Sequence, residues 1–335
     1  LGAVKRLNGM FAFAFWDERE RKLWLGRDRL GIKPLFYAFW QERILGSSEL
    51  GPLLSFDFLQ ESLDEKAAYH YMSLLSVPEP YTFYERIRRF PAGHVGEVVG
   101  DGGMRLWPYW SLSFAKIRGS GGELAEQVRN KFAEAVRRQL VADVPLGVLL
   151  SGGIDSNVLL SHMARQSSSP VKSFAMGFEG GEDESDAARR SAELLNCEHA
   201  SHQLAADHLW REIPQILRAF GEPFAGGLPM WFLCREVSKQ VKVALCGSGG
   251  DEMFGNYGRI RQLRPKLGWG SALRSGMRLY GAMAFMEPMS PRMRYLLRHG
   301  APLGHLHHDK TYPVPEWRKR SLLLRPPEIR SDRWL

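Results

Sequence analysis

A glycine-rich loop with two hydroxyl groups and one acid follows a short apolar run at residues 148–156, which read Val-Leu-Leu-Ser-Gly-Gly-Ile-Asp-Ser. The apolar run predicts a buried strand that ends at Leu150, and a helix is expected after the loop. In open α/β sheets, the N–H groups at the carboxyl ends of strands and at helix N-termini bind anions. The loop is therefore predicted to hold the phosphates of a nucleotide through Ser151, Gly152, Gly153 and Ser156, with Asp155 beside them in the same site.

The acid distinguishes this loop from the commonest phosphate loop. The Walker A sequence ends in Gly-Lys-Ser/Thr, whereas this loop carries Asp155 and no lysine. A carboxylate beside phosphates repels them unless a cation lies between, so the loop implies a bound Mg²⁺. The competing interpretation is an ordinary strand-to-helix turn, and the complete Ser-Gly-Gly-x-Asp-Ser string favours the nucleotide site.

A second loop of the same kind follows another apolar run, with the sequence Leu245-Cys-Gly-Ser-Gly-Gly-Asp-Glu-Met-Phe-Gly-Asn-Tyr257. Its glycines permit close approach of the main chain to a ligand. Asp251 and Glu252 could complete a magnesium site with Asp155. In that site, Asp155 and Asp251 are expected to be the metal ligands. Both loops follow predicted strands, so we expect them to form one site. A glycine-rich turn with solvated acids is the alternative.

Helices and strands are expected to alternate around these loops. Apolar residues recur at every fourth position over 124–140 and predict a helix with one apolar stripe. Strands are expected at 146–150, 171–178 and 241–246, with helices from about residue 157 and over 186–195. Such alternation predicts an α/β fold with a mostly parallel sheet.

The first ~115 residues have the pattern of short strands and turns instead. Strands are expected at 10–16, 22–26, 35–39 and 43–46, with a hairpin over 94–107, and together they predict an antiparallel sheet. The capping-box pattern of Ser62 and Glu65 predicts a helix through about Ser76. The stretch Gly119-Ser-Gly-Gly122 is the best linker candidate, so we expect two domains, residues 1–118 and 119–335.

These motifs resemble those of a known family. Ser151 to Ser156 is similar to the pyrophosphate-binding loop of the N-type ATP pyrophosphatases, and Cys246 to Glu252 resembles the second signature of asparagine synthetases. Further segments, among them Gly26 to Leu35, resemble the later part of that family's class II glutaminase domain. The resemblance implies a PP-loop ATP pyrophosphatase domain of the adenine nucleotide alpha hydrolase-like α/β fold. Before it, the resemblance implies a partial antiparallel α+β domain of the N-terminal nucleophile (Ntn) glutaminase type.

The resemblance also implies an activity. Members bind ATP and Mg²⁺, activate the side-chain carboxylate of aspartate as an acyl-adenylate, and amidate it with ammonia derived from glutamine. It implies that Leu150, Met176, Cys246 and Gly247 contact the nucleotide, and that Ser248 and Glu252 act with the two aspartates in catalysis. Glu222, in a Glu-Pro-Phe stretch, would bind the acceptor. An ordinary core position for Met176 and a solvated loop acid for Glu222 remain open.

The match departs from the family at three places. The family hydrolyses glutamine with an N-terminal cysteine, whereas this chain begins at Leu1, so we expect the chain as given not to hydrolyse glutamine. No later family signature is recognised after Tyr257, so the second domain is expected to be incomplete at its C-terminus. Ser248 stands where the family has an acid. The alternatives are therefore a related amidotransferase or β-lactam-synthetase-like enzyme acting on another carboxylate, or a non-catalytic nucleotide-binding relative.

Length and composition exclude several other classes. A chain of 335 residues with 44% hydrophobic residues can bury sizeable cores, and no apolar run reaches the roughly 18 residues that span a bilayer. We expect a cytoplasmic protein whose three cysteines, Cys197, Cys234 and Cys246, form neither disulfides nor a zinc site. The net charge is +8, but the basic residues are scattered apart from a looser cluster between Arg259 and Arg333. We therefore expect small-molecule partners and no nucleic acid, and a homodimer remains open.

Overall fold

The computed structural model describes residues 2–59, 62–99, 103–178, 184–204, 206–224, 227–255 and 314, and these form two compact units. The first unit comprises residues 2–113, 217–224 and 314, and the second comprises residues 114–216 and 227–255. A segment of the later sequence therefore packs with the earlier one. The expected domain boundary after residue 118 lies close to the change of unit at Ser113 and stays a prediction. The basic cluster between Arg259 and Arg333 lies outside the described residues.

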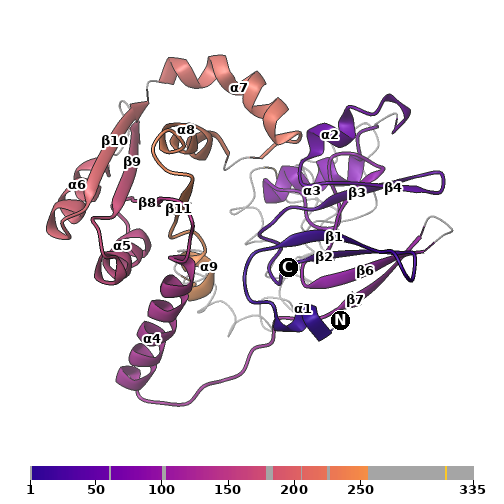
Figure 1. Ribbon diagram of the computed structural model, residues 1–335. Coiled ribbons are helices and arrows are strands. Elements are labelled where there is room, and N and C mark those ends of the chain that lie inside the picture. The colour runs from indigo at the N-terminus through magenta and orange to yellow at the C-terminus, as the bar shows by residue number, and fades with distance from the viewer. Residues whose placement is uncertain are drawn as a thin grey trace, which may run out of the picture. The chain divides into compact units, whose positions relative to one another are not determined.

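Two antiparallel sheets build the first unit (Figure 1). One has the strand order β1-β2-β6-β7, formed by Ala12–Asp17, Lys22–Arg27, His94–Val99 and Gly103–Pro108. The other has the order β4-β3-β5, formed by Arg43–Ser47, Phe36–Trp40 and Ile87–Arg89. Buried Leu25, Leu35 and Phe90 pack with Tyr37 and Ile44, and this cluster joins side chains from both sheets. The expected antiparallel structure and the hairpin of β6 and β7 are confirmed.

Short helices complete the first unit: α1 (Gly2–Arg6), α2 (Leu50–Leu54), the 3₁₀ helix η1 (Asp57–Leu59) and α3 (Glu65–Leu74). The expected cap of α3 is wrong. Asp64 is the N-cap, and its carboxylate accepts hydrogen bonds from the N–H groups of Lys66 at 2.9 Å and Ala67 at 3.1 Å. The Ser62 hydroxyl instead donates to Glu85 at 2.6 Å. Asp64 directly precedes the helix, where a carboxylate caps well.

A parallel sheet forms the centre of the second unit, with the order β10-β9-β8-β11. These strands are Glu198–Leu204, Lys172–Phe178, Leu146–Leu149 and Val243–Leu245. The helices are α4 (Gly121–Gln139), α5 (Ile154–Gln166), α6 (Ser185–Leu194), α8 (Gly227–Val237) and α9 (Gly250–Phe254). Helix α7 (Ala206–Phe220) belongs to this unit up to residue 216 and to the first unit from residue 217. The predicted α/β fold is confirmed. Strand β10 was missed, because its sequence Glu-His-Ala-Ser-His-Gln-Leu has no β-branched residues and lies at the sheet edge.

Helices cover both faces of this sheet (Figure 1). On one face, Val148 and Leu150 pack with apolar residues of α4, α5 and α6, and on the other Phe174 packs with Val237 and Val241. Strands β8 and β11 are parallel neighbours, with Val148 opposite Leu245. The loops that follow these two strands therefore start side by side at the carboxyl ends of the strands.

Helix α4 begins inside the stretch that was expected to be a linker. Ser120 is its N-cap, and Ser120 and Glu123 form a capping box in which each side chain binds the other's backbone N–H. Residues 110–120 before it form neither helix nor strand. In the described part of the chain, no helix is long and apolar enough to cross a membrane. Cys197, Cys234 and Cys246 are free thiols.

The turn after β2 is held by one buried carboxylate. Asp28 is 1% exposed and accepts hydrogen bonds from the N–H groups of Phe11, Leu30, Ile32 and Lys33. Burial acts to raise the pKa of the Asp28 carboxyl, but these backbone hydrogen bonds outweigh it, and the pKa lies below its ordinary value. The ionised carboxylate thus connects the turn to the segment before β1.

We expect Asp28→Asn to destabilise this turn by about 2 kcal/mol at pH 7, since hydrogen bonds to a charged group are lost. Because the folded-state pKa is lowered, the carboxylate contributes stability above its unfolded pKa of about 4 and loses it as the pH falls through the folded value. Hydrogen exchange of the amides in β1 and β2 measures the effect. The exposed Asp57→Asn is the control, and equal exchange in the two variants would contradict the role of Asp28.

Candidate functional site

The Ser156 hydroxyl stabilises the loop between β8 and α5 through hydrogen bonds. Its hydroxyl is buried, with 5% of the residue exposed, and accepts the N–H of Ser151 at 3.1 Å. The same oxygen lies 3.0 Å from the Ser151 carbonyl, 3.2 Å from the Gly153 carbonyl and 2.9 Å from Ser151 Oγ. The hydroxyl that was predicted to bind phosphate is therefore engaged within the loop and sets its shape, while Ser151 is exposed.

Of the two loop glycines, Gly152 lies against helix α6 and Gly153 contacts the loop itself. The Gly153 N–H donates to Ser151 Oγ at 3.2 Å, and the Gly152 N–H donates to Glu184 Oε2 at 3.1 Å. A Cβ atom on Gly152 would lie 3.1 Å from the Cβ of Ala187 and 3.2 Å from that of Glu184, so only glycine fits without a shift. Sequence reasoning did not predict Glu184, because the contact joins distant segments. The only sequence feature that could have indicated Glu184 is an acid at the start of a helix that follows a strand of the same sheet.

The two glycine-rich loops touch each other. A Cβ atom on Gly247 would lie 2.9 Å from the backbone nitrogen of Ser156 and 3.1 Å from Asp155 Cβ. A Cβ atom on Gly250 would overlap the carboxylate of Asp155. Gly249 between them has φ +99°, which disfavours other residues. The loops after β8 and β11 thus form one site, with the Asp155 carboxylate against the main chain of the second loop.

Two aspartates at this contact are open to a ligand. Asp155 and Asp251 are both half-buried, and within the described residues neither carboxylate has a hydrogen bond or an ion pair. Asp251 lies in the first turn of α9, directly after Gly250. Three metal-ligating side chains are nowhere grouped in the described part of the chain. Any cation held by these two acids would need further ligands from a substrate or from water.

The remaining predicted residues differ in their surroundings. Leu150 is buried, and its N–H donates to the carbonyl of Phe174 at 2.7 Å. Met176 packs with an apolar cluster formed by Leu204, Ile216 and Phe232, and its contact with the nucleotide stays a prediction. Exposed positions are occupied by Cys246, Ser248 and Glu252, which follow β11. Their assignment to the nucleotide and to catalysis stays a prediction.

Glu222 lies in the first unit and already has partners there. Its carboxylate forms an ion pair with Arg89 and accepts the N–H of Phe83 at 3.2 Å, while the Tyr84 hydroxyl donates to the Gly221 carbonyl at 2.6 Å. The Glu222 side chain is 10% exposed. These contacts hold segment 217–224 in the first unit, and they compete with the predicted binding of an acceptor ammonium group. Sequence reasoning missed Arg89, because nothing in its neighbourhood indicates a distant partner.

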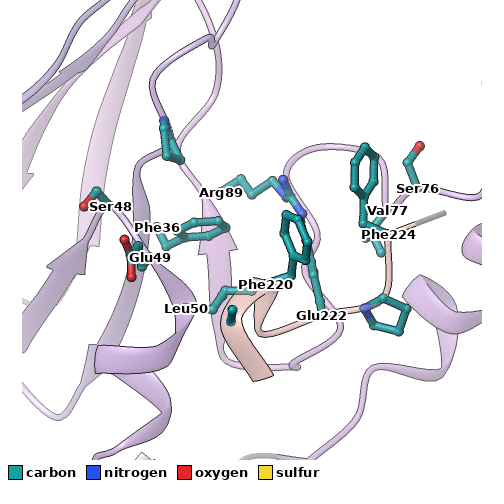
Figure 2. Close-up of a pocket in the computed structure, with 13 residues that line it drawn as sticks. Phe36, Ser48, Glu49, Leu50, Ser76, Val77, Arg89, Phe220, Glu222 and Phe224 are labelled. Carbon is teal, nitrogen blue, oxygen red and sulfur yellow. Dashed lines mark ion pairs between the residues drawn. The ribbon is translucent and has the colours of Figure 1, made fainter. Parts of the chain in front are cut away.

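A cavity of about 370 Å³ lies beside this ion pair (Figure 2). Arg89 and Glu222 form one part of its wall. Its apolar wall consists of Phe36, Leu50, Val77, Phe220 and Phe224, and Ser48, Glu49 and Ser76 add polar groups. The wall therefore mixes apolar side chains with polar and charged ones. Arg89 and Glu222 neutralise each other, so the wall provides no unpaired charge from that pair.

Comparison with known proteins decides the family. A family model described as "Asparagine synthase" matches residues 127–325, and one described as "Glutamine amidotransferase domain" matches residues 2–110. The chain belongs to the asparagine synthase family. In this family member, the first match covers the parallel sheet with both glycine-rich loops, and the second covers the antiparallel sheets.

Curated relatives agree with this assignment. "Asparagine synthetase [glutamine-hydrolyzing] 1" of Bacillus subtilis is 34% identical over 263 residues, which are 78% of this chain and 41% of that protein. "Putative asparagine synthetase [glutamine-hydrolyzing]" of Mycobacterium bovis is 35% identical over 78% of this chain and 42% of its own. "Amidase chry2" of Gibberella zeae is 32% identical over the same shares. The chain spans about two fifths of the length of these relatives.

The contact between the loops predicts the effect of one methyl group. We expect Gly250→Ala to push the Asp155 carboxylate away and to destabilise the second unit by about 1–3 kcal/mol, as overpacking does. Hydrogen exchange of the β8 and β11 amides is the measurement. Gly121→Ala is the control, because a Cβ atom there meets nothing within 4 Å. Unchanged exchange in both variants would contradict the close contact.

Proposed function

We propose that this chain carries the ATP-dependent half of an asparagine synthetase (glutamine-hydrolysing) reaction. ATP activates the side-chain carboxylate of aspartate as an acyl-adenylate, and ammonia derived from glutamine then displaces AMP. The observation that carries the proposal is the contact of the Asp155 carboxylate with Gly250, which joins the two glycine-rich loops at one sheet edge. The family assignment and the names of the relatives support it.

The chemistry requires little more than positioning and charge neutralisation. A carboxylate oxygen of aspartate attacks the α-phosphorus of ATP, and the bond from that phosphorus to the bridging oxygen breaks, so pyrophosphate leaves. Ammonia then attacks the acyl carbon, loses a proton, and AMP departs with its oxygen. The loop of Ser151, Gly152 and Gly153 would hold the leaving pyrophosphate, because its N–H groups follow a parallel strand and precede α5.

Mg²⁺ fits the acids at this edge. Asp155 and Asp251 supply two carboxylates without partners in the described residues, and phosphate oxygens would complete the ligand set. Bound there, the cation would neutralise the negative charge of the phosphates beside the two acids. Asp155 is oriented for this by its contact with Gly250, and Asp251 by its place in the first turn of α9.

A cytoplasmic location and small-molecule partners belong to the same proposal. The substrates would be ATP, aspartate and glutamine or ammonia, and a homodimer is compatible with it. The three free thiols are compatible with a reducing compartment. The glutaminase step would belong to the glutamine amidotransferase domain, whose family model matches residues 2–110.

Removing either acid should abolish activation. We expect Asp155→Asn and Asp251→Asn each to lower aspartate-dependent release of pyrophosphate from ATP by about 100-fold or more, since charge stabilisation of this kind is worth that much. Asp186→Asn is the control, because this exposed acid pairs with Arg189 on α6. Full activity in both loop variants, or an equal loss in the control, would contradict the proposed site.

A different carboxylate acceptor is the second candidate, and Ser248 favours it. Ser248 is exposed. The resemblance of its loop to the second signature of asparagine synthetases implies an acid at this position, and a hydroxyl cannot provide that charge. The relative named "Amidase chry2" shows that proteins named for other activities occur among the matches.

The acceptor can be tested directly. If aspartate is the acceptor and only the acid is missing, Ser248→Glu should raise aspartate-dependent pyrophosphate release by about ten-fold, equivalent to about 1.4 kcal/mol in the barrier. A panel of other carboxylates is assayed in parallel with the unchanged protein. Release that requires a carboxylate other than aspartate would favour the second candidate, and Ser248→Ala controls for the loss of the hydroxyl.

A further inference from the structure

The amide groups that the proposed site would offer to a phosphate are already occupied. Ser151 N–H donates to Ser156 Oγ, Gly153 N–H donates to Ser151 Oγ, and Gly152 N–H donates to Glu184 Oε2. The first two acceptors are hydroxyls of the loop itself. Only the third is an anion, and it comes from a different segment, the residue that precedes α6.

Within the part of the chain that the structure describes, the Glu184 carboxylate has no partner other than this amide. Glu184 is exposed, and none of the ion pairs within the described residues includes it. The nearest arginine along α6, Arg189, instead pairs with Asp186 at 3.2 Å and Glu193 at 2.9 Å. As the N-cap residue of α6, Glu184 makes no capping hydrogen bond with its side chain. Its carboxylate therefore points to the loop and not to its own helix.

A carboxylate oxygen and a phosphate oxygen compete for the same kind of donor. The Gly152 N–H lies at the carboxyl end of β8 and before the N-terminus of α5, where backbone dipoles favour an anion. We propose that Glu184 is an internal anion that competes with pyrophosphate for the Gly152 N–H and must turn away from it when a nucleotide binds. This rests on the proposed function of the loop.

The hydrogen bond between Glu184 and Gly152 has different effects before and after a nucleotide binds. When no nucleotide is bound, the hydrogen bond to Glu184 satisfies the Gly152 amide. When a nucleotide binds, the hydrogen bond from the Gly152 amide to the Glu184 carboxylate must break, and the negative charge of the carboxylate repels the phosphates. Because Glu184 is exposed, its side chain can turn into solvent without moving buried groups. Glu184 thus lowers the affinity for the anion and favours release of pyrophosphate.

Inorganic pyrophosphate is the probe, titrated by calorimetry with Mg²⁺ at a fixed concentration. Glu184→Ala removes both the charge and the acceptor, and we expect it to tighten pyrophosphate binding by about five-fold. Glu184→Gln keeps an acceptor of the same length without the charge, so we expect a smaller gain of about two- to three-fold. A ligand or support role for Glu184 requires the opposite, weaker binding in both variants, which would overturn the proposal.

Asp186→Asn is the matched control, because it removes the same charge two residues away from a carboxylate that pairs with Arg189. Equal tightening in Asp186→Asn and Glu184→Gln would show a general charge effect and would also overturn the proposal. The pH and salt concentration are held constant across the series, since salt screens the charge.

A readout without any ligand separates this proposal from the function on which it rests. In anion-free protein labelled with ¹⁵N-glycine, the Gly152 amide resonance should shift in Glu184→Ala and stay in Asp186→Asn, and pyrophosphate should move it again. An unchanged Gly152 resonance in Glu184→Ala would reject the internal anion while leaving ATP cleavage intact. If the resonance shifts but no variant binds pyrophosphate, both the internal anion and the proposed phosphate loop are rejected.

Discussion

The second unit depends on one close approach, that of the loop after β11 to the first turn of α5. Gly247 lies against the backbone of Asp155 and Ser156, and Gly250 lies against the Asp155 carboxylate. Neither contact leaves space for a side chain. The parallel pairing of β8 with β11 makes this approach possible, because it ends both strands at the same edge. The position of Asp155, and with it the proposed site for Mg²⁺ and phosphate, follows from these glycines.

Around this contact, the loop groups are satisfied internally rather than left open. Ser156 binds both Ser151 and Gly153, and Glu184 takes the Gly152 amide. A buried hydroxyl or a main-chain donor without a partner is costly, so the N–H groups of the proposed phosphate loop need partners when no ligand is bound. The hydroxyls of Ser156 and Ser151 provide partners from within the loop. Glu184 provides an exchangeable one, because its side chain is exposed.

In the first unit, a segment of the later sequence is held by side chains of the earlier sequence. Arg89 pairs with Glu222, Phe83 donates to the same carboxylate, and Tyr84 binds Gly221. Gly221 has φ +72°, and a Cβ atom there would lie 2.7 Å from Leu50. These contacts explain why residues 217–224 belong to a unit different from that of the residues on either side. They also give Glu222 a structural partner that its Glu-Pro-Phe context did not indicate.

The sequence by itself determined the elements with strong local signals. The apolar runs, the glycine loops and the acid at position 155 predicted β8, β11 and their meeting, because strand ends, turns and phosphate loops have local residue requirements. The sequence pattern did not reveal β10, because a strand at the side of a sheet needs few apolar residues. It also predicted Ser62 as the cap of α3, because the capping-box pattern does not show that Asp64 is the N-cap. Only the tertiary structure decided that Glu184 binds Gly152 and that Arg89 binds Glu222. Those pairs join residues far apart in the chain, and a charged side chain carries no local mark of the partner that folding brings to it.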